Sequence, residues 1–194
     1  PLASEKKYRE ELDRAEVREM LLAVLRKELE RLDASGLKPV YLEYEFGPGP
    51  DAHAPALELK TGKRSLKVQG RIDRIDSDPE KKLALVVDYK RSAKFDRSGL
   101  ELGVSLQLPL YLMAVERHLG LIPVGGELYS IKDGKRSGFY RKDAIEKVPG
   151  EFNKKAFCSE EEFRRILERT VAFVGRFAAE IEDLRIVVRP RDCE

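Results

Sequence analysis

Residues 70–90 read Gly70-Arg-Ile-Asp-Arg-Ile-Asp-Ser-Asp-Pro-Glu-Lys-Lys-Leu-Ala-Leu-Val-Val-Asp-Tyr-Lys90. Two apolar-rich runs flank residues 78–81, whose composition is that of a turn, so the stretch predicts two antiparallel strands joined by a tight reversal near Pro79. Facing residues then have numbers that sum to about 161, and Asp73 and Asp88 satisfy this condition. Their Cβ atoms would lie roughly 5 Å apart across the hairpin.

These two aspartates are candidate metal ligands, because carboxylates that close repel each other unless a cation lies between them. Lys90 follows Asp88 by two residues and therefore shares its side of the strand. Two carboxylates and an ammonium group suit a hydrated Mg²⁺ beside a phosphodiester. The alternative is a solvated pair at two strand ends, which we disfavour because strands are depleted in Asp. For Asp76, next to the turn, we expect turn stabilisation rather than metal binding.

Composition predicts one soluble, globular domain over residues 1–194, with 42% apolar and 37% charged residues. The sequence has no apolar run of 18 residues and no signal-peptide pattern, so we expect no membrane partner. A net charge of +2 neither requires nor excludes a nucleic acid. With two cysteines we expect no disulfide framework and a reducing cytoplasm. From its ends, Pro1 and Glu194, we expect a domain truncated at both sides of a longer protein.

Periodicity predicts a mixed α/β domain with helices packed on a central sheet. Helices are expected over residues 4–32, 104–119 with Pro109 near the first turn, and from a capping box at Ser159. Besides the first hairpin, strands are expected over residues 40–46, 56–60, 66–76, 126–131, about 139–140, and 186–188.

Gln107 and Tyr111 are four residues apart and would lie on one face of the second helix. Together they could contact phosphate oxygens or hold a water network at Lys90. They could equally be part of an ordinary amphipathic helix with a tyrosine at its boundary, and spacing alone does not separate the two.

Basic residues near the hairpin could follow a DNA backbone, although charged runs are more often solvated faces. Residues 91–99 form the best candidate for a phosphate-tracking loop. Glu45 could support the metal ligands from the preceding strand, but we favour a solvent-facing glutamate. His53 and His118 are expected at the surface, since neither has metal-ligand spacing to a second His or Cys. The basic candidates are Arg71, Arg74, Arg91, Lys94 and Arg97.

In combination these motifs resemble the PD-(D/E)xK nuclease superfamily, and specifically the RecB-type nuclease domain found in AddB subunits of bacterial helicase–nucleases. The resemblance is carried by Gly70–Asp76, by Asp88-Tyr-Lys90 and by Gln107-Leu-Pro-Leu-Tyr111, with a similar approach over residues 39–47. It covers residues 39–111 well and the last helix more loosely. The combination is specific, whereas any one motif alone would be weak.

The resemblance implies a restriction-endonuclease-like mixed central sheet flanked by helices. It implies that Asp73, Asp88 and the backbone carbonyl of Tyr89 bind Mg²⁺ or Mn²⁺, and that Lys90 positions the attacking water. Gln107 and Tyr111 would support the site. The implied reaction is exonuclease hydrolysis of phosphodiesters at DNA ends, together with a helicase partner, in double-strand-break repair and recombination. No P-loop ATPase motif is present in the sequence.

Two features depart from the family pattern. The family carries an upstream Gly-x-x-x-His helix whose histidine is a further metal ligand, and nothing in residues 1–36 matches it. The AddB type also binds a 4Fe-4S cluster, for which Cys193 resembles the first trailing cysteine; the set is not completed in this chain. Cys158 matches no such position, and we expect it to be structural or incidental.

Two other functions remain open on the sequence. One is a non-catalytic, nuclease-like module that binds DNA or docks a helicase, which the missing histidine favours and the Asp/Asp/Lys set disfavours. The other is a stand-alone RecB-like nuclease of the CRISPR-adaptation type.

Overall fold

The computed structural model describes residues 3–184 apart from 63, 79 and 93. Within that part of the chain, no helix combines the length and the apolar character needed to cross a bilayer. In chain order the elements are α1 (Ala3–Ser35), β1 (Lys38–Phe46), β2 (Leu57–Thr61), β3 (Arg64–Val68), β4 (Gly70–Asp78), β5 (Leu83–Lys90), α2 (Arg97–Glu101), α3 (Gln107–Leu119), β6 (Ile122–Ser130), β7 (Arg136–Arg141), α4 (Lys142–Ile145), the 3-10 helix η1 (Lys154–Ala156), β8 (Phe157–Cys158) and α5 (Glu160–Glu182).

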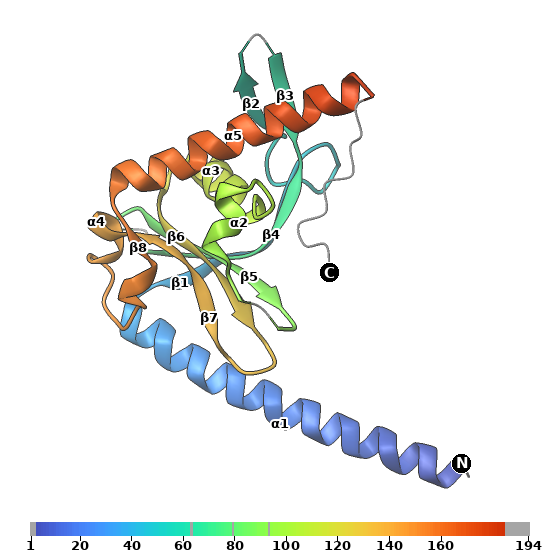
Figure 1. Ribbon diagram of the computed structural model, residues 1–194. Helices are drawn as coiled ribbons and strands as arrows, with labels where there is room; N and C mark the ends of the chain where they lie inside the picture. The colour runs from blue at the N-terminus through green and yellow to red at the C-terminus, as the bar shows by residue number, and fades with distance from the viewer. Residues whose placement is uncertain (1–2, 63, 79, 93, 185–194) are drawn as a thin grey trace.

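Six strands form a central sheet in the order β1-β4-β5-β6-β7-β8, and β2 and β3 form a separate two-stranded hairpin. The pairs β5–β6 and β7–β8 are parallel and the other pairs are antiparallel, so the predicted mixed α/β fold is confirmed. The helices α3 and α5 cover one face of the sheet, and the β2–β3 hairpin packs against these helices and projects past α5 (Figure 1). The end of α1 and the short α4 lie on the other face.

The central strand β5 is buried on both faces, which explains why its sequence is a continuous apolar run. Ala84 and Val86 point into the core under α3 and α5. Leu85 and Val87 point into a second core on the opposite face, under the end of α1 and α4. Because side chains alternate along a strand, Asp88 continues the first series and Tyr89 the second. Two consecutive residues of β5 therefore point to opposite faces of the sheet: Asp88 to the face of the candidate site and Tyr89 to the other face.

The register predicted for the hairpin is confirmed over five pairs, and the predicted Asp73↔Asp88 pair lies one step beyond the last of them. Each pair from Arg74↔Val87 to Asp78↔Leu83 sums to 161. The predicted reversal itself includes residue 79, which lies outside the described residues. The single strand expected over residues 66–76 is wrong, because the chain changes sheets at Gln69: β3 pairs with β2, and β4 joins β1 in the central sheet.

The structure confirms several local signals for helix ends. Gly36 ends α1 with φ of 68°, and Pro109 lies in the first turn of α3, where its missing N–H costs no helical hydrogen bond. The Ser159 side chain accepts a hydrogen bond from the Glu162 N–H at 3.1 Å and caps α5. The short helix α2 was not predicted, and the strand expected over residues 186–188 lies outside the described residues.

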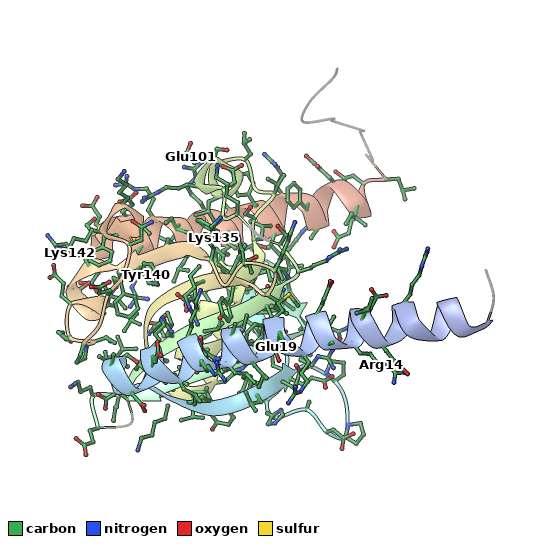
Figure 2. The ribbon with its side chains drawn as sticks, turned by 90° about the horizontal axis from the view of Figure 1, so that it is seen from below. Arg14, Glu19, Glu101, Lys135, Tyr140 and Lys142 are labelled. Carbon is green, nitrogen blue, oxygen red and sulfur yellow. The ribbon has the colours of Figure 1, made fainter. Side chains whose placement is uncertain are left out.

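The amphipathic pattern of α1 does not produce a buried stripe along its whole length. Leu12, Leu25 and Leu29 are exposed, while Glu28 is buried against the sheet. Figure 2 shows Arg14 on the stretch of α1 that extends past the sheet. Only the last turns of this helix therefore contribute to the packed fold among the described residues.

Candidate active site

Asp73 and Asp88 meet where the regular β4–β5 ladder ends, one residue beyond the Arg74↔Val87 pair. An Asp73 carboxylate oxygen accepts a hydrogen bond from the Tyr89 N–H at 2.7 Å. Asp88 is 1% exposed, and burial raises its pKa; Lys90 counteracts this rise, and the nearby Asp73 carboxylate adds to it. The structure thus places both predicted carboxylates in one site, with one of them strongly desolvated.

Lys90, Gln107 and Tyr111 surround Asp88. The Lys90 Nζ lies 2.6 Å from Asp88 Oδ2 and donates a hydrogen bond to Gln107 Oε1 at 3.3 Å. The Gln107 Nε2 donates to Asp88 Oδ1 at 2.9 Å and to the Tyr111 hydroxyl at 3.0 Å. Gln107 and Tyr111 thus lie on one face of α3, as their spacing predicted, and Gln107 links this face to Asp88 on β5.

Gly70, the first residue of the motif, makes room for this arrangement. A Cβ at this position would lie 2.9 Å from Cζ of Phe46 and 3.2 Å from Cε1 of Tyr111. These two rings pack edge to face, with centroids 6.3 Å apart, directly over the glycine. A side chain at residue 70 would displace Tyr111 and, through it, Gln107.

The residues present fit a divalent cation. Asp88 Oδ2 is buried, and the Lys90 ammonium is its ion-pair partner at 2.6 Å. Mg²⁺ is commonly bound through one or two carboxylates while it keeps several waters. Among the described residues, no group of three or more His, Cys, Asp or Glu side chains is placed to hold a metal. The protein ligands would thus be two carboxylates, completed by backbone or water oxygens.

The basic candidates divide into exposed and buried residues. Arg91 and Lys94 are exposed, Arg71 is exposed and pairs with Glu43 at 3.0 Å, and Arg97 pairs with Glu162. Arg74 was expected at a DNA surface, and this prediction is wrong. Its side chain is 5% exposed, on the opposite face of the sheet from Asp88.

The prediction that Asp76 stabilises the turn is also wrong. Asp76 is completely buried and accepts a hydrogen bond from Arg74 at 2.7 Å. Asp78 stabilises the turn instead, because its Oδ1 accepts hydrogen bonds from the N–H groups of Glu80 and Lys81, both at 3.1 Å. Sequence alone did not separate two aspartates that are two residues apart on one strand.

The remaining candidates lie away from the carboxylates. Glu45 is exposed as expected, and its N–H donates to Nδ1 of His53, which is also exposed. His118 is half-buried against Phe46, and burial lowers its pKa. Cys158 is buried and its thiol donates to the Tyr140 carbonyl at 3.3 Å, which fits a structural role. Cys193, the iron–sulfur candidate, lies outside the described residues.

The comparison with protein families agrees with the geometry. The family model described as the PD-(D/E)XK nuclease superfamily matches residues 1–194. The chain belongs to this superfamily. As the resemblance predicted, it is also similar to proteins that are named as AddB-type subunits of an ATP-dependent helicase/deoxyribonuclease.

The relative from Lysinibacillus sphaericus is 38% identical over 96 residues, which cover 47% of this chain and 8% of that protein. The relative from Pediococcus pentosaceus is 36% identical over 115 residues, 57% of this chain and 9% of that protein. The matched part of the chain therefore spans less than a tenth of the length of either relative. A solved structure described as the crystal structure of SSO0001 covers 88% of this chain and 60% of its own, at 17% identity and a TM-score of 0.31, too weak a likeness to bear on the site.

Proposed function

We propose that this chain is a metal-dependent nuclease domain that hydrolyses DNA phosphodiesters, with Asp73, Asp88 and the backbone carbonyl of Tyr89 as protein ligands of Mg²⁺ or Mn²⁺. The observation that carries the proposal is the desolvated Asp88 carboxylate. It lies beside the Asp73 carboxylate, which adds to the rise of its pKa, and it pairs with the Lys90 ammonium at 2.6 Å. A buried carboxylate in this state is stabilised by a cation.

Each side chain then has a distinct role. When bound, Mg²⁺ polarises the phosphodiester and lowers the pKa of a water ligand. Lys90 orients the attacking water and offsets negative charge that builds on the phosphate, since its ammonium lies at the edge of the site with a 41% exposed side chain. Gln107 holds Asp88 and Lys90 at fixed positions through its two amide atoms.

A groove of about 350 Å³ opens beside the site and offers a path for DNA. Lys90 and Gln107 line it, together with Lys94 and Phe95 from the loop before α2. The ammonium groups can pair with phosphates, and the apolar wall can contact sugars or bases. Arg91 and Arg71 are also exposed, and in this proposal they add basic groups to the DNA-binding surface.

The names of the relatives, as subunits of an ATP-dependent helicase/deoxyribonuclease, support a proposal for the biological setting. We infer that this domain works beside a helicase subunit or domain in the cytoplasm, as an exonuclease acting at DNA ends during double-strand-break repair and recombination. In a full-length protein of this type, Cys193 would contribute to a 4Fe-4S cluster.

One observation favours a non-catalytic, nuclease-like module instead. Residues 1–36 contain no match to the upstream Gly-x-x-x-His motif, whose histidine would be a further metal ligand. A scaffold of this kind would bind DNA or a helicase without a functional cation site, and metal titration separates the two functions.

The test is the thermal stability of the protein as Mn²⁺ is added, for the wild type and for Asp88→Asn. Binding at about 100 times Kd stabilises the folded state by about 2.7 kcal/mol, which is readily measured. We expect the wild type to be stabilised and to cleave DNA, and Asp88→Asn to lose both effects. Glu45→Gln, which changes an exposed strand carboxylate, is the matched control and should behave as wild type. An equal Mn²⁺ response in wild type and Asp88→Asn would contradict the proposal.

A further inference from the structure

A group of ionic side chains lies on the face of the sheet opposite Asp88. It ties α1 to strands β4, β6 and β7, and its three arginines and three carboxylates balance in charge. We call it the far-side cluster. Its members are Glu28, Arg31, Arg74, Asp76, Glu127 and Arg136.

Arg74 connects this cluster to the candidate site. Its Nη2 donates to Asp76 at 2.7 Å and also to Glu28 on α1, while its Nη1 donates to the Tyr89 hydroxyl at 2.5 Å. The guanidinium carbon also lies 5.6 Å from the centroid of the Tyr89 ring. Because charge-assisted hydrogen bonds in a buried site are strong and directional, this guanidinium has little freedom to move.

Tyr89 is therefore held from both faces of the sheet. On the site face its N–H donates to Asp73, and on the opposite face its side chain is held by Arg74 and packs on Tyr129, with ring centroids 5.6 Å apart. The regular β4–β5 pairs end at Arg74↔Val87. Beyond this pair, the hydrogen bond from β5 to β4 is accepted by the Asp73 side chain instead of by a backbone group.

We propose that Arg74 and the Tyr89 hydroxyl are positioning residues that set the orientation of the Asp88–Lys90 backbone, and with it the affinity of the site for its divalent cation. This inference rests on the proposed function, because it concerns the same cation site. The physical basis is general: groups that orient a metal ligand without touching the metal tune metal affinity, and their removal commonly costs about 10–100-fold. Arg74 orients Tyr89, whose backbone lies between Asp88 and Lys90.

A purely structural role for Arg74 makes a different prediction. In that case loss of its contacts would lower the free energy of unfolding, and the affinity of the folded protein for the metal ion would not change. The two roles are separated by a variant that removes one atom from the chain of contacts and leaves packing intact. Tyr89→Phe does this, since it deletes the hydroxyl that Arg74 contacts.

The matched control is Tyr140→Phe. The Tyr140 hydroxyl donates to Glu127 Oε2 at 2.7 Å, so the same atom is deleted at the same cluster, but on β7, and the hydrogen bond that is lost goes to β6 rather than to Tyr89 of β5. Both variants are expected to lower the melting temperature. Only Tyr89→Phe is expected to change the response to metal.

The experiment measures the Mn²⁺ concentration that gives half of the maximal thermal shift and half of the maximal DNA cleavage. For Tyr89→Phe we expect this concentration to rise about 10-fold, with cleavage recovering at saturating Mn²⁺. Arg74→Lys, which keeps the charge but loses the planar fork, should raise it as well. If Arg74→Lys does not fold, Tyr89→Phe decides.

The inference is overturned if Tyr89→Phe has the wild-type half-saturating concentration, or if Tyr140→Phe shifts it equally. A wild type that shows no Mn²⁺ response in either measurement refutes the proposed function and this inference with it. A wild type that responds, with Tyr89→Phe indistinguishable from it, refutes the positioning role alone.

Discussion

The carboxylate of Asp73 accepts a hydrogen bond from the backbone N–H of Tyr89 at 2.7 Å, just beyond the last regular pair of the β4–β5 hairpin. One oxygen of a proposed metal ligand thus also holds the neighbouring strand in place. The structural and chemical contributions of this carboxylate can be separated, because an amide keeps the acceptor oxygen but loses the charge.

We predict that Asp73→Asn has nearly the wild-type free energy of unfolding but loses metal-dependent cleavage. Asp73→Ala should lose cleavage as well and be less stable by about 1 kcal/mol, since the Tyr89 N–H then lacks its partner. Urea denaturation of both variants, together with a cleavage assay, checks the prediction. Equal destabilisation by Asn and Ala would show that the hydrogen bond does not contribute as described.

Lys90 and Lys94 both line the groove beside the site, but only Lys90 pairs with Asp88. We predict that Lys90→Ala slows DNA cleavage by at least about 100-fold with the fold and DNA affinity largely retained, because it removes an ammonium group from the reacting phosphate. Lys94→Ala should weaken DNA binding modestly and leave the rate at saturating DNA unchanged. Single-turnover cleavage and a binding titration measure both effects. Cleavage by Lys90→Ala at the wild-type rate would remove Lys90 from the mechanism.

Gly70 lies under the rings of Phe46 and Tyr111, and a Cβ there would approach Phe46 to 2.9 Å. We predict that Gly70→Ala lowers the free energy of unfolding by about 1–3 kcal/mol, the usual cost of an added methyl group in a packed site. It should also reduce cleavage, since the displaced Tyr111 contacts Gln107. Thermal unfolding and a cleavage assay on the soluble variant test this. An unchanged melting temperature would mean that the rings move aside without cost.

Asp88 should make stability depend on pH in an unusual direction. Burial raises its pKa above the ordinary 3.8, so the folded protein binds this proton more tightly than the unfolded chain does. The free energy of unfolding therefore falls as pH rises through the interval above 3.8, and this loss persists at neutral pH. Without divalent metal, we predict that Asp88→Asn is more stable than wild type near pH 7 and that the difference disappears as pH approaches about 4.

Asp78 provides a control with the opposite sign. Its hydrogen bonds with Lys81 lower its pKa, so it contributes stability at neutral pH that is lost as pH falls below 3.8. Asp78→Asn should be less stable than wild type near pH 7 and equal to it in acid. Chemical denaturation in the presence of a chelator, at both pH values, measures the two variants side by side. The same sign for both would contradict the assignment for Asp88.

Cys158 should be chemically inert in the folded protein. The side chain is 3% exposed, and burial raises the pKa of its thiol to about 11, so the reactive thiolate is scarce at neutral pH. We predict that iodoacetamide modifies the Cys158 peptide slowly in the native protein and rapidly in denaturant, as followed by mass spectrometry. Rapid modification of the native protein would show that β8 opens readily.

Some features of this protein follow from local sequence. A turn between two apolar-rich runs determines the register of the β4–β5 hairpin, in which the numbers of paired residues sum to 161. This register is local, because each contact in a hairpin joins residues that are close in the chain. The same is true of the capping box at Ser159 and of Pro109 in a first helical turn. These signals are local, and the structure confirms them.

Other features were decided by tertiary structure. Arg74 occupies an alternating strand position that reads as solvent-facing, yet it is buried because Glu28, 46 residues away, comes to lie over it on α1. The break between β3 and β4 likewise depends on which neighbouring strand each one finds. The sequence by itself determined the hairpin and the residues that it carries, since those depend on alternation and turn chemistry. Only the packing of distant segments determined which charges are buried, because burial depends on what covers a residue rather than on its neighbours in the chain.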